Sequence, residues 1–467
     1  MGDLHIKSKR PPKHQELSGF GNLTIKSIID SYKKGQVSPV DIAKICIDEF
    51  KRFEKHFQAW EYFDEKKLIL QARNSEKYIN TNKIIRPLEG IPVGIKDIFN
   101  TVDYPTQMGS KIWKGFTPGN DARVVYSIKQ AGAVIPGKTV TAEFAVHTLG
   151  KTLNPHNIKR TPGTSSSGSA VAIALGMVPV ALGTQTAGSI IRPASFCGVY
   201  GFKPSFGLIP RTGMLKTTDS LDTVGFFASH ADDLKYFFDI IRVRGKDYPI
   251  SDHALNDQNR QRKPTPRPWR IAFVETHVWK YAREYVKKSI SSWTDKISRA
   301  KDIEVSHVNL PDIMKYAHET HAQIYDKSLS YYFKEEFKKS TLVSPIMYQL
   351  INHGNKISLS TYKNALQTQI KMADAMDKFL KNFDILVSLA TASEAPLRTQ
   401  TEDPDPALMW TMTYLPAINI PAFVSMDGMP FGVQLAARRY NDYLLLDFVN
   451  YLKELSIIPL GANPLFV

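Results

Sequence analysis

Apolar residues recur every three to four positions from Leu23 to Ala72, and this spacing predicts amphipathic helices near the start of the chain. Gly35 and Pro39 interrupt the pattern, so we expect one helix to end and another to begin there. The stretch 282–383 has a mostly helical pattern and is rich in Tyr, Phe, Lys and Gln. Further helices are predicted over 120–133 and 229–243.

Short apolar runs bounded by glycine, proline or polar residues predict buried strands between these helices. They lie at 91–98, 134–135, 178–182, 270–274, 384–390, 415–421 and 432–435. A length of 467 residues would by itself suggest about three domains of ordinary size. No internal repeat divides the chain, so the pattern alone leaves the domain number open.

The segment from Pro162 to Pro204 carries two serine clusters bracketed by glycines. The first, Gly163–Gly168, precedes an alanine-rich apolar run that predicts a buried helix. Ser165 and Ser166 would then lie at the helix N-terminus, where unpaired N–H groups and the helix dipole favour developing negative charge. Serines that cap a helix are usually structural, so this cluster alone does not establish a catalytic site.

The second serine cluster is the loop Gly183–Ser189, directly after the predicted strand 178–182. A small-residue loop at a strand end lets backbone N–H groups approach a substrate closely, as an oxyanion hole requires, although such runs are also common in ordinary loops. A serine nucleophile needs an adjacent base, and 162–204 contains no histidine. If one of these serines is the nucleophile, we expect its base to come from elsewhere and not to be an imidazole.

Lys96 closes an apolar strand within Leu88–Asp97, a position that is unusual for lysine because lysines prefer solvated faces. Burial lowers the pKa of a lysine amine from its usual value near 10.4, and a neutral Lys96 would be a competent base. The alternative is a lysine that extends to solvent at the strand end and pairs with Asp97 or another carboxylate.

Taken in their order along the chain, the Lys96 segment and the two serine clusters closely resemble the amidase signature family. In that family a GIPVxIKD segment precedes a GGSSGGSA segment and a GSIR-type segment. Further matches extend the resemblance over nearly the whole chain, at Gly137–Phe144, Asn154–Pro155, Gly201–Pro204, Asp222–Gly225 and Pro430–Gln434. The resemblance implies one large α/β domain over 23–467, with a central mixed β-sheet covered by helices on both faces. It also implies that the variable helical stretch 282–383 forms a substrate funnel, and it leaves 1–22 as a basic N-terminal extension.

By position, the resemblance implies a Ser–cisSer–Lys triad in which Ser189 is the nucleophile, Ser165 the bridging serine and Lys96 the neutral base. We expect no cofactor and no metal in this chemistry. Met108 follows the Lys96 loop and is a candidate substrate contact. The implied backbone N–H donors of the oxyanion hole are Thr186, Ala187, Gly188 and Ser189, and the implied supporting residues are Ser166 and Arg192.

Three residues depart from the usual family pattern. Thr164 precedes Ser165 where the family usually has glycine, and a β-branched residue tightens the sterics of the cis peptide that the resemblance implies. Gln185 replaces the usual aspartate of the nucleophile loop. Arg192 lies three residues after Ser189 rather than two, which changes the carboxylate or carbonyl that we expect it to contact.

The function that the resemblance implies is hydrolysis of a carboxamide C–N bond through a serine acyl-enzyme. The segments Glu394–Pro396 and Trp410–Thr411 resemble a stand-alone amidase subgroup. One alternative is the glutaminase subunit of a tRNA-dependent amidotransferase, which would need a second protein chain. The other is a non-catalytic binding protein on the same fold. The expected partner is a small-molecule amide, with homodimer formation left open.

The net charge of +15 would suit nucleic-acid binding, but the lysines are scattered, so a solvated basic surface is favoured and no nucleic acid is expected. Dense basic runs occur only at Lys7–Lys13 and at 259–270, and the second is proline-rich and predicts an exposed linker. No signal peptide or membrane-spanning run is evident, so we expect a cytoplasmic protein without stable membrane association.

Two cysteines in so long a chain indicate a reducing compartment, and the apolar neighbours of Cys197 favour a buried packing role over a reactive thiol. His318 and His321 lie three positions apart on a predicted helix, a spacing that could bind a metal ion. No further ligand is evident in the sequence, so we expect exposed histidines instead.

Overall fold

The computed structural model describes residues 19–245 and 248–461. Residues 1–18 of the predicted basic extension, including the basic run Lys7–Lys13, lie outside the described residues. In the described part of the chain, eleven strands form one sheet in the order β1-β3-β2-β4-β6-β5-β10-β11-β9-β7-β8. Their bounds are β1 (Trp60–Phe63), β2 (Val93–Lys96), β3 (Gly137–Thr139), β4 (Val180–Gln185), β5 (Tyr200–Lys203), β6 (Thr223–Ala228), β7 (Trp269–Phe273), β8 (Ile303–His307), β9 (Ile385–Leu389), β10 (Ala417–Val424) and β11 (Pro430–Ala436).

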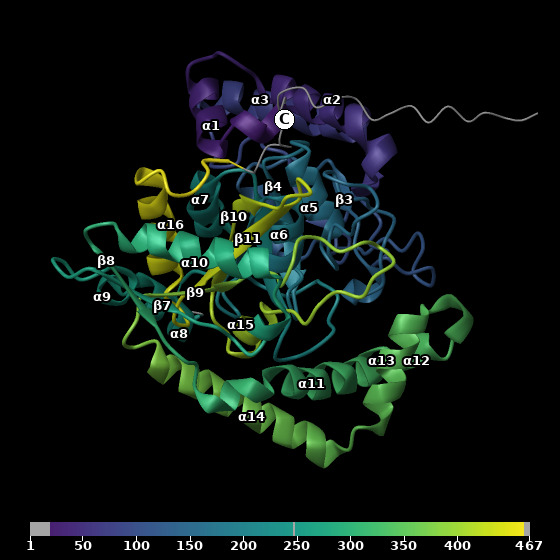
Figure 1. Cartoon of the computed structure of the whole chain (residues 1–467). Helices are drawn as coiled ribbons and strands as arrows, with labels where there is room; N and C mark the ends of the chain where they lie inside the picture. Colours follow the sequence, from purple (N-terminus) through teal and green to yellow (C-terminus); the bar gives the residue numbers. More distant parts are fainter. Residues whose placement is uncertain (1–18, 246–247, 462–467) are drawn as a thin grey trace, which may run out of the picture.

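The sheet is mixed: β2 pairs parallel with β3 and β4, β7 pairs parallel with β8 and β9, and the other neighbours are antiparallel. Helices α1–α3 lie at one end of the molecule and α11–α14 at the other (Figure 1). The predicted α/β fold with one large mixed sheet is confirmed. The helices are α1 (Ile25–Lys33), α2 (Pro39–Phe57), α3 (Glu65–Asn82), α4 (Arg123–Gln130), α5 (Ser167–Ala174), α6 (Ile191–Cys197), α7 (Ala231–Ile241), α8 (Pro249–Asn256), α9 (Gln258–Gln261), α10 (Glu284–Ser298), α11 (Ala317–Tyr332), α12 (Lys334–Phe337), α13 (Pro345–Lys356), α14 (Leu359–Phe379), α15 (Leu408–Met412) and α16 (Asp442–Glu454).

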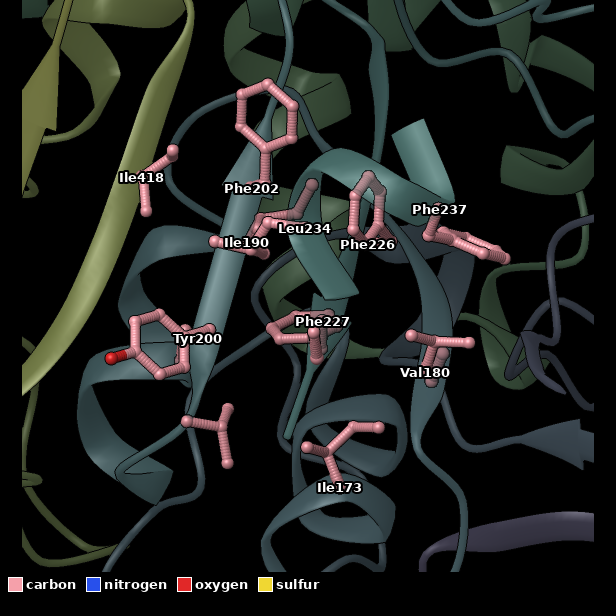
Figure 2. Packing of buried hydrophobic residues seen from close by; sticks show 14 of the residues in the cluster. Ile173, Val180, Ile190, Tyr200, Phe202, Phe226, Phe227, Leu234, Phe237 and Ile418 are labelled. Carbon is pink, nitrogen blue, oxygen red and sulfur yellow. The ribbon is translucent and has the colours of Figure 1, made fainter. Parts of the chain in front are cut away.

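The centre of the sheet is packed on both faces. Side chains alternate along a strand, so Phe226 and Phe227 of β6 point to opposite faces (Figure 2). The Phe226 ring packs against Phe237 of α7, with ring centroids 4.9 Å apart, while Phe227 lies on the side of Ile173 of α5. Strand β4 pairs with β6, so this packing also positions β4 and the start of the loop that follows it.

The predicted break near Gly35 and Pro39 is confirmed, because α1 ends at Lys33 and α2 begins at Pro39. The start of α2 follows from its sequence. The Ser38 side chain accepts a hydrogen bond from the Asp41 N–H, the Asp41 carboxylate accepts one from the Ser38 N–H, and proline occupies the first helical position.

Three local predictions were wrong. The region predicted to be helical up to Ala72 contains strand β1, which pairs with β3. The strand expected at 134–135 contributes only a bridge between Pro92 and Val134, and the paired strand is β3. The segment 259–270 is not simply an exposed linker, because it includes part of α9 and because Arg267 forms an ion pair with Asp384, with an N–O distance of 2.6 Å.

Cys46 and Cys197 are buried free thiols, and burial raises the pKa of both. The predicted packing role of Cys197 is confirmed. Across residues 19–245 and 248–461, none of the helices has the length and apolar character needed to cross a membrane.

Candidate active site

The sheet topology brings Lys96 and the second serine loop to one edge. Strands β2 and β4 are parallel neighbours, with Val93 opposite Val180. Their carboxyl ends therefore lie at the same edge of the sheet, and β2 ends at Lys96 while the loop Thr186–Ser189 follows the last residue of β4. In open α/β sheets, ligands bind in crevices at the carboxyl ends of the strands.

The Lys96 amine is completely buried and contacts three hydroxyl groups. Its Nζ lies 2.8 Å from Ser165 Oγ, 2.9 Å from Ser166 Oγ and 2.8 Å from Thr184 Oγ1. The alternative of a solvent-exposed lysine paired with Asp97 is wrong, since the Asp97 carboxylate pairs with Lys138 at 3.1 Å. The structure thus joins the predicted lysine to Ser165 and Ser166, two of the three serines of the first cluster.

Burial lowers the pKa of Lys96 well below its ordinary value. The negative charge of Asp222 acts in the opposite direction, and the positive charge of Arg192 lowers the pKa further. Because burial dominates, the uncharged amine forms at lower pH than it would on an exposed lysine.

The neighbouring pair Lys138–Asp97 is structural, and its loss should be costly. Lys138→Met is expected to destabilise the fold by about 3–5 kcal/mol, because it leaves the Asp97 carboxylate buried without its cationic partner. Burial already raises the pKa of Asp97 to about 6 despite that partner. The measurement is the urea midpoint. Lys33→Met, which breaks the exposed pair Lys33–Asp30, is the control and should leave the midpoint almost unchanged.

Ser165 and Ser166 lie immediately before α5, as the sequence predicts. The peptide bond between Thr164 and Ser165 is cis. The Ser166 hydroxyl donates a hydrogen bond to the Thr184 carbonyl at 3.2 Å, which ties this turn to the end of β4. Ser165, Ser166 and Thr184 are all buried, so the hydroxyls around Lys96 are surrounded by the protein core and not by solvent.

The loop after β4 offers hydrogen-bonding groups that the protein leaves unused. Among the described residues, no acceptor takes a hydrogen bond from the backbone N–H of Ala187, Gly188 or Ser189, and the Ser189 hydroxyl has no hydrogen-bond partner. Asp405 lies directly against Gly188, where an added Cβ would sit 1.9 Å from its Oδ2. Only glycine therefore permits this approach of the carboxylate to the loop.

A cavity of about 560 Å³ adjoins this loop. Thr164, Ala187 and Arg192 line it from the sheet side, and His321 and Tyr325 of α11 line it from the helical region. The volume falls within the range of small-molecule sites. Met108 is buried and donates its N–H to the Asp97 carbonyl, and it is not among the cavity-lining residues, so its contact with substrate stays a prediction.

A family model described as Amidase matches residues 41–446. The chain belongs to the amidase signature family. It is 27% identical to a glutamyl-tRNA(Gln) amidotransferase subunit from Clostridium botulinum over 94% of this chain and 99% of that protein. A solved structure of a vestigial protein complex, related to the origins of an s-triazine catabolic enzyme, matches with 25% identity and a TM-score of 0.84 over 94% of this chain and 100% of that one.

The peptide amidase of Stenotrophomonas maltophilia shares the fold, with a TM-score of 0.80 and 22% identity over 96% of this chain and 99% of that one. These likenesses confirm the predicted family and fold. As a member of the amidase signature family, the chain is an enzyme that hydrolyses C–N bonds.

Arg192, shifted by one position from the usual family pattern, links the two serine loops of this amidase. Its Nη1 pairs with Asp405 and its Nε with Glu402, at 3.0 Å for the second pair. Its Nη2 donates to the Thr164 carbonyl at 2.7 Å. The guanidinium therefore joins the turn that carries Ser165 to the helix that begins just after Ser189.

Several residues around this amidase site were not singled out from the sequence. Thr184 contacts Lys96, and Asp222 accepts a hydrogen bond from the Thr186 hydroxyl at 2.8 Å. The Thr411 hydroxyl donates to the Ala187 carbonyl at 2.7 Å. Asp222 and Thr411 both fall in segments that match the family, but nothing in their local pattern indicates which atoms they contact.

The prediction of exposed histidines on α11 was wrong. His321 is 5% exposed, and its Nε2 lies 2.9 Å from the Thr186 carbonyl. His318 is partly buried, with Nδ1 2.8 Å from His277 Nε2 and Nε2 3.0 Å from the Asp405 carbonyl. Both imidazoles face the site because α11 packs over the loops rather than facing solvent.

The spacing of His318 and His321 is compatible with binding a metal ion, which would need at least one further ligand. Within residues 19–245 and 248–461, no three side chains of His, Cys, Asp or Glu are grouped so that they could hold a metal ion.

Proposed function

We propose that this chain is an amidohydrolase that cleaves a small carboxamide through a serine acyl-enzyme, with Ser189, Ser165 and Lys96 as its triad. The observation that carries the proposal is the buried Lys96 amine 2.8 Å from the Ser165 hydroxyl, at the sheet edge from which the Ser189 loop extends. A cavity of about 560 Å³ beside that loop suits a small-molecule substrate.

The hydrogen bonds around Lys96 support its role as a base. The Ser166 hydroxyl gives its proton to the Thr184 carbonyl, so its oxygen accepts an N–H from Lys96. A second N–H goes to the Thr184 hydroxyl. A neutral amine has two N–H groups and one lone pair, so in this arrangement the lone pair is left to accept the Ser165 proton.

The proposed reaction begins when Ser189 Oγ attacks the carbonyl carbon of the amide. Its proton passes to Ser165 Oγ as the Ser165 proton passes to Lys96 Nζ. The relay then returns a proton to the amide nitrogen, the C–N bond breaks, and the amine or ammonia leaves an acyl-enzyme. Water attacks the ester through the same relay, releases the carboxylic acid and restores Ser189.

The free N–H groups of the loop would stabilise the oxyanion that forms during the attack. The donors that we propose are those of Thr186, Ala187, Gly188 and Ser189. Donors preorganised in a buried site are worth more than donors in water, and removing one typically costs about 10²–10³ in rate.

A second candidate function is the glutaminase subunit of an amidotransferase. It is favoured by the likeness to the Clostridium botulinum protein over almost the full length of both chains. The segments Glu394–Pro396 and Trp410–Thr411 favour a stand-alone enzyme instead. Affinity purification of the tagged chain from its own organism would distinguish the two functions. A component of an amidotransferase should purify with a second chain, and a stand-alone enzyme should purify without one.

The test of the proposal is reaction with a fluorophosphonate probe, followed by a screen of an amide library for released ammonia. We expect stoichiometric labelling at Ser189, located by mass spectrometry, and no labelling after denaturation. Hydrolysis of at least one amide should be blocked by the same labelling. A folded protein that neither reacts with the probe nor releases ammonia would instead be a binding protein on this fold.

A further inference from the structure

Two consecutive peptide groups in the Thr186–Ser189 loop are held by side chains through their carbonyls. His321 Nε2 lies 2.9 Å from the Thr186 carbonyl oxygen. The Thr411 hydroxyl donates to the Ala187 carbonyl oxygen at 2.7 Å. Each carbonyl shares its peptide group with the N–H of the next residue, so these two contacts act on the groups that carry the Ala187 and Gly188 N–H.

The direction of those N–H groups follows from peptide geometry. Both peptide bonds are trans, and in a planar trans peptide the C=O and N–H point in opposite directions. The Ala187 N–H therefore points away from His321, and the Gly188 N–H points away from Thr411. Neither N–H has an acceptor among the described residues, so both are left for a group outside the protein.

Gln185 determines which way the Thr411 hydroxyl proton points. The Gln185 Oε1 accepts hydrogen bonds from the N–H groups of Ile190 at 2.9 Å and Ile191 at 3.0 Å. Its amide nitrogen must then face Thr411, to whose Oγ1 it donates at 3.1 Å. A hydroxyl that accepts from Gln185 has its own proton free, and that proton goes to the Ala187 carbonyl.

The imidazole of His321 is fixed in a similar way. Burial lowers the pKa of His321 to about 4, so the ring is neutral at ordinary pH. A carbonyl can only accept, so Nε2 carries the proton and donates it to Thr186. The ring also stacks on Tyr325, with centroids 5.4 Å apart, which holds its plane.

We propose that Gln185, Thr411 and His321 are positioning residues that aim the Ala187 and Gly188 N–H groups at the oxyanion by fixing the carbonyls on the other side of the same peptide groups. This inference rests on the proposed function, because it assigns the loop the role of an oxyanion hole. Gln185 stands where the family usually has aspartate, and in this proposal its amide nitrogen orients the Thr411 hydroxyl. An ionised carboxylate at this position has no proton to donate to Thr411.

The experiment compares isosteric variants by the rate of fluorophosphonate labelling and by kcat and KM on an amide from the library screen. Thr411→Val removes the donor to Ala187, and Gln185→Glu turns the amide donor into an acceptor that competes for the Thr411 proton. An oxyanion exists only near the transition state, so kcat and the labelling rate should fall about tenfold or more while KM stays near the wild-type value.

Rescue and a matched control separate positioning from packing. Thr411→Ser keeps the hydroxyl and should recover most of the rate. Thr413→Val removes another buried hydroxyl of the same segment, one that donates to the Met409 carbonyl and not to the loop, so its kcat should match wild type. His321→Phe should lower kcat as Thr411→Val does, and His321→Gln, which retains an N–H donor, should lower it less. Thermal midpoints verify that each variant is folded.

The outcomes distinguish failure of the positioning role from failure of the proposed function. If the wild-type chain reacts with the probe but Thr411→Val and Gln185→Glu behave like Thr413→Val, the positioning role is wrong while the proposed function stands. The positioning role is also rejected if kcat and the labelling rate fall in Thr411→Val and are not recovered in Thr411→Ser. If the wild-type chain neither reacts with the probe nor hydrolyses any amide, the proposed function fails and this inference fails with it.

Discussion

Lys96→Met should lower kcat for amide hydrolysis by about 10⁴-fold or more, because it removes the amine that contacts Ser165 while preserving the length and apolar character of the stem. Its three hydroxyl partners would lose the group that joins them. The measurement is ammonia release under saturating substrate, together with the fluorophosphonate labelling rate. Lys96→Arg should be equally inactive, because a guanidinium stays charged and cannot accept the Ser165 proton.

The pH dependence gives an independent check on the same residue. In the mechanism that we propose, neutral Lys96 is the base, so the rate should rise with pH as the amine loses its proton. Since burial lowers the pKa of Lys96, this rise should lie well below the usual range of lysine. The quantity to measure is kcat/KM against pH, which reports the free enzyme.

The charges near Lys96 should move that profile in opposite directions. Arg192 lowers the pKa of Lys96, so Arg192→Met should shift the rising limb to higher pH. Asp222 raises that pKa, so Asp222→Asn should shift the limb to lower pH. Both residues also hold loops, so each variant should lose rate as well, but the sign of the shift depends only on the charge removed. Shifts of the same sign, or full activity in acid, would contradict Lys96 as the base.

The sequence predicted the parts of the site that depend on short-range pattern. Lysine at the end of an apolar strand is a local anomaly that marked Lys96, but the pattern left a buried base and a solvated lysine both open, and the structure decides for burial. The serines before α5 were likewise located by the apolar run behind them. The assignment of roles needed the family resemblance, since a glycine-rich serine loop has the same local pattern whether or not it binds a substrate.

The contacts that the sequence missed are those between distant segments. Thr184 and Lys96 are 88 positions apart, and Thr411 and Ala187 are 224 apart, so no local periodicity links them. Strand β3 was missed because its residues Gly, Lys and Thr lack an apolar pattern, and Lys138 is buried there by its pairing with Asp97. Tertiary contacts override local propensity at such positions.

The error on α11 has the same origin. Its sequence is polar around His318 and His321, which is typical of a solvated helix face. The helix instead packs its imidazoles against backbone carbonyls of two loops, at Thr186 and Asp405. Every residue has a backbone carbonyl, so the sequence does not show where such an acceptor will lie. A polar helix face that packs against backbone carbonyls therefore has the same sequence pattern as one exposed to water.

Ser189→Ala should remove hydrolysis and probe labelling together, with kcat falling on the order of 10⁴–10⁶. The Ser189 hydroxyl has no hydrogen-bond partner among the described residues, so its loss should cost the fold little and the thermal midpoint should stay near that of wild type. Ser195→Ala is the matched control. Its hydroxyl contacts Thr391 and accepts from the Gly432 N–H, away from the loop, so its kcat should be retained even if its midpoint falls.

The bridging role of Ser165 is tested by combining the two changes. Ser165→Ala should by itself lower kcat almost as far as Ser189→Ala, because Lys96 would lose the hydroxyl through which we propose that it acts. Residues that act as one unit are not additive, so the double variant should be no slower than Ser189→Ala alone. If Ser165→Ala retained most of the activity while Ser189→Ala lost it, the proton would have to reach Lys96 by another path. Thr184 and Ser166, both within 2.9 Å of the amine, would then be the groups to replace next.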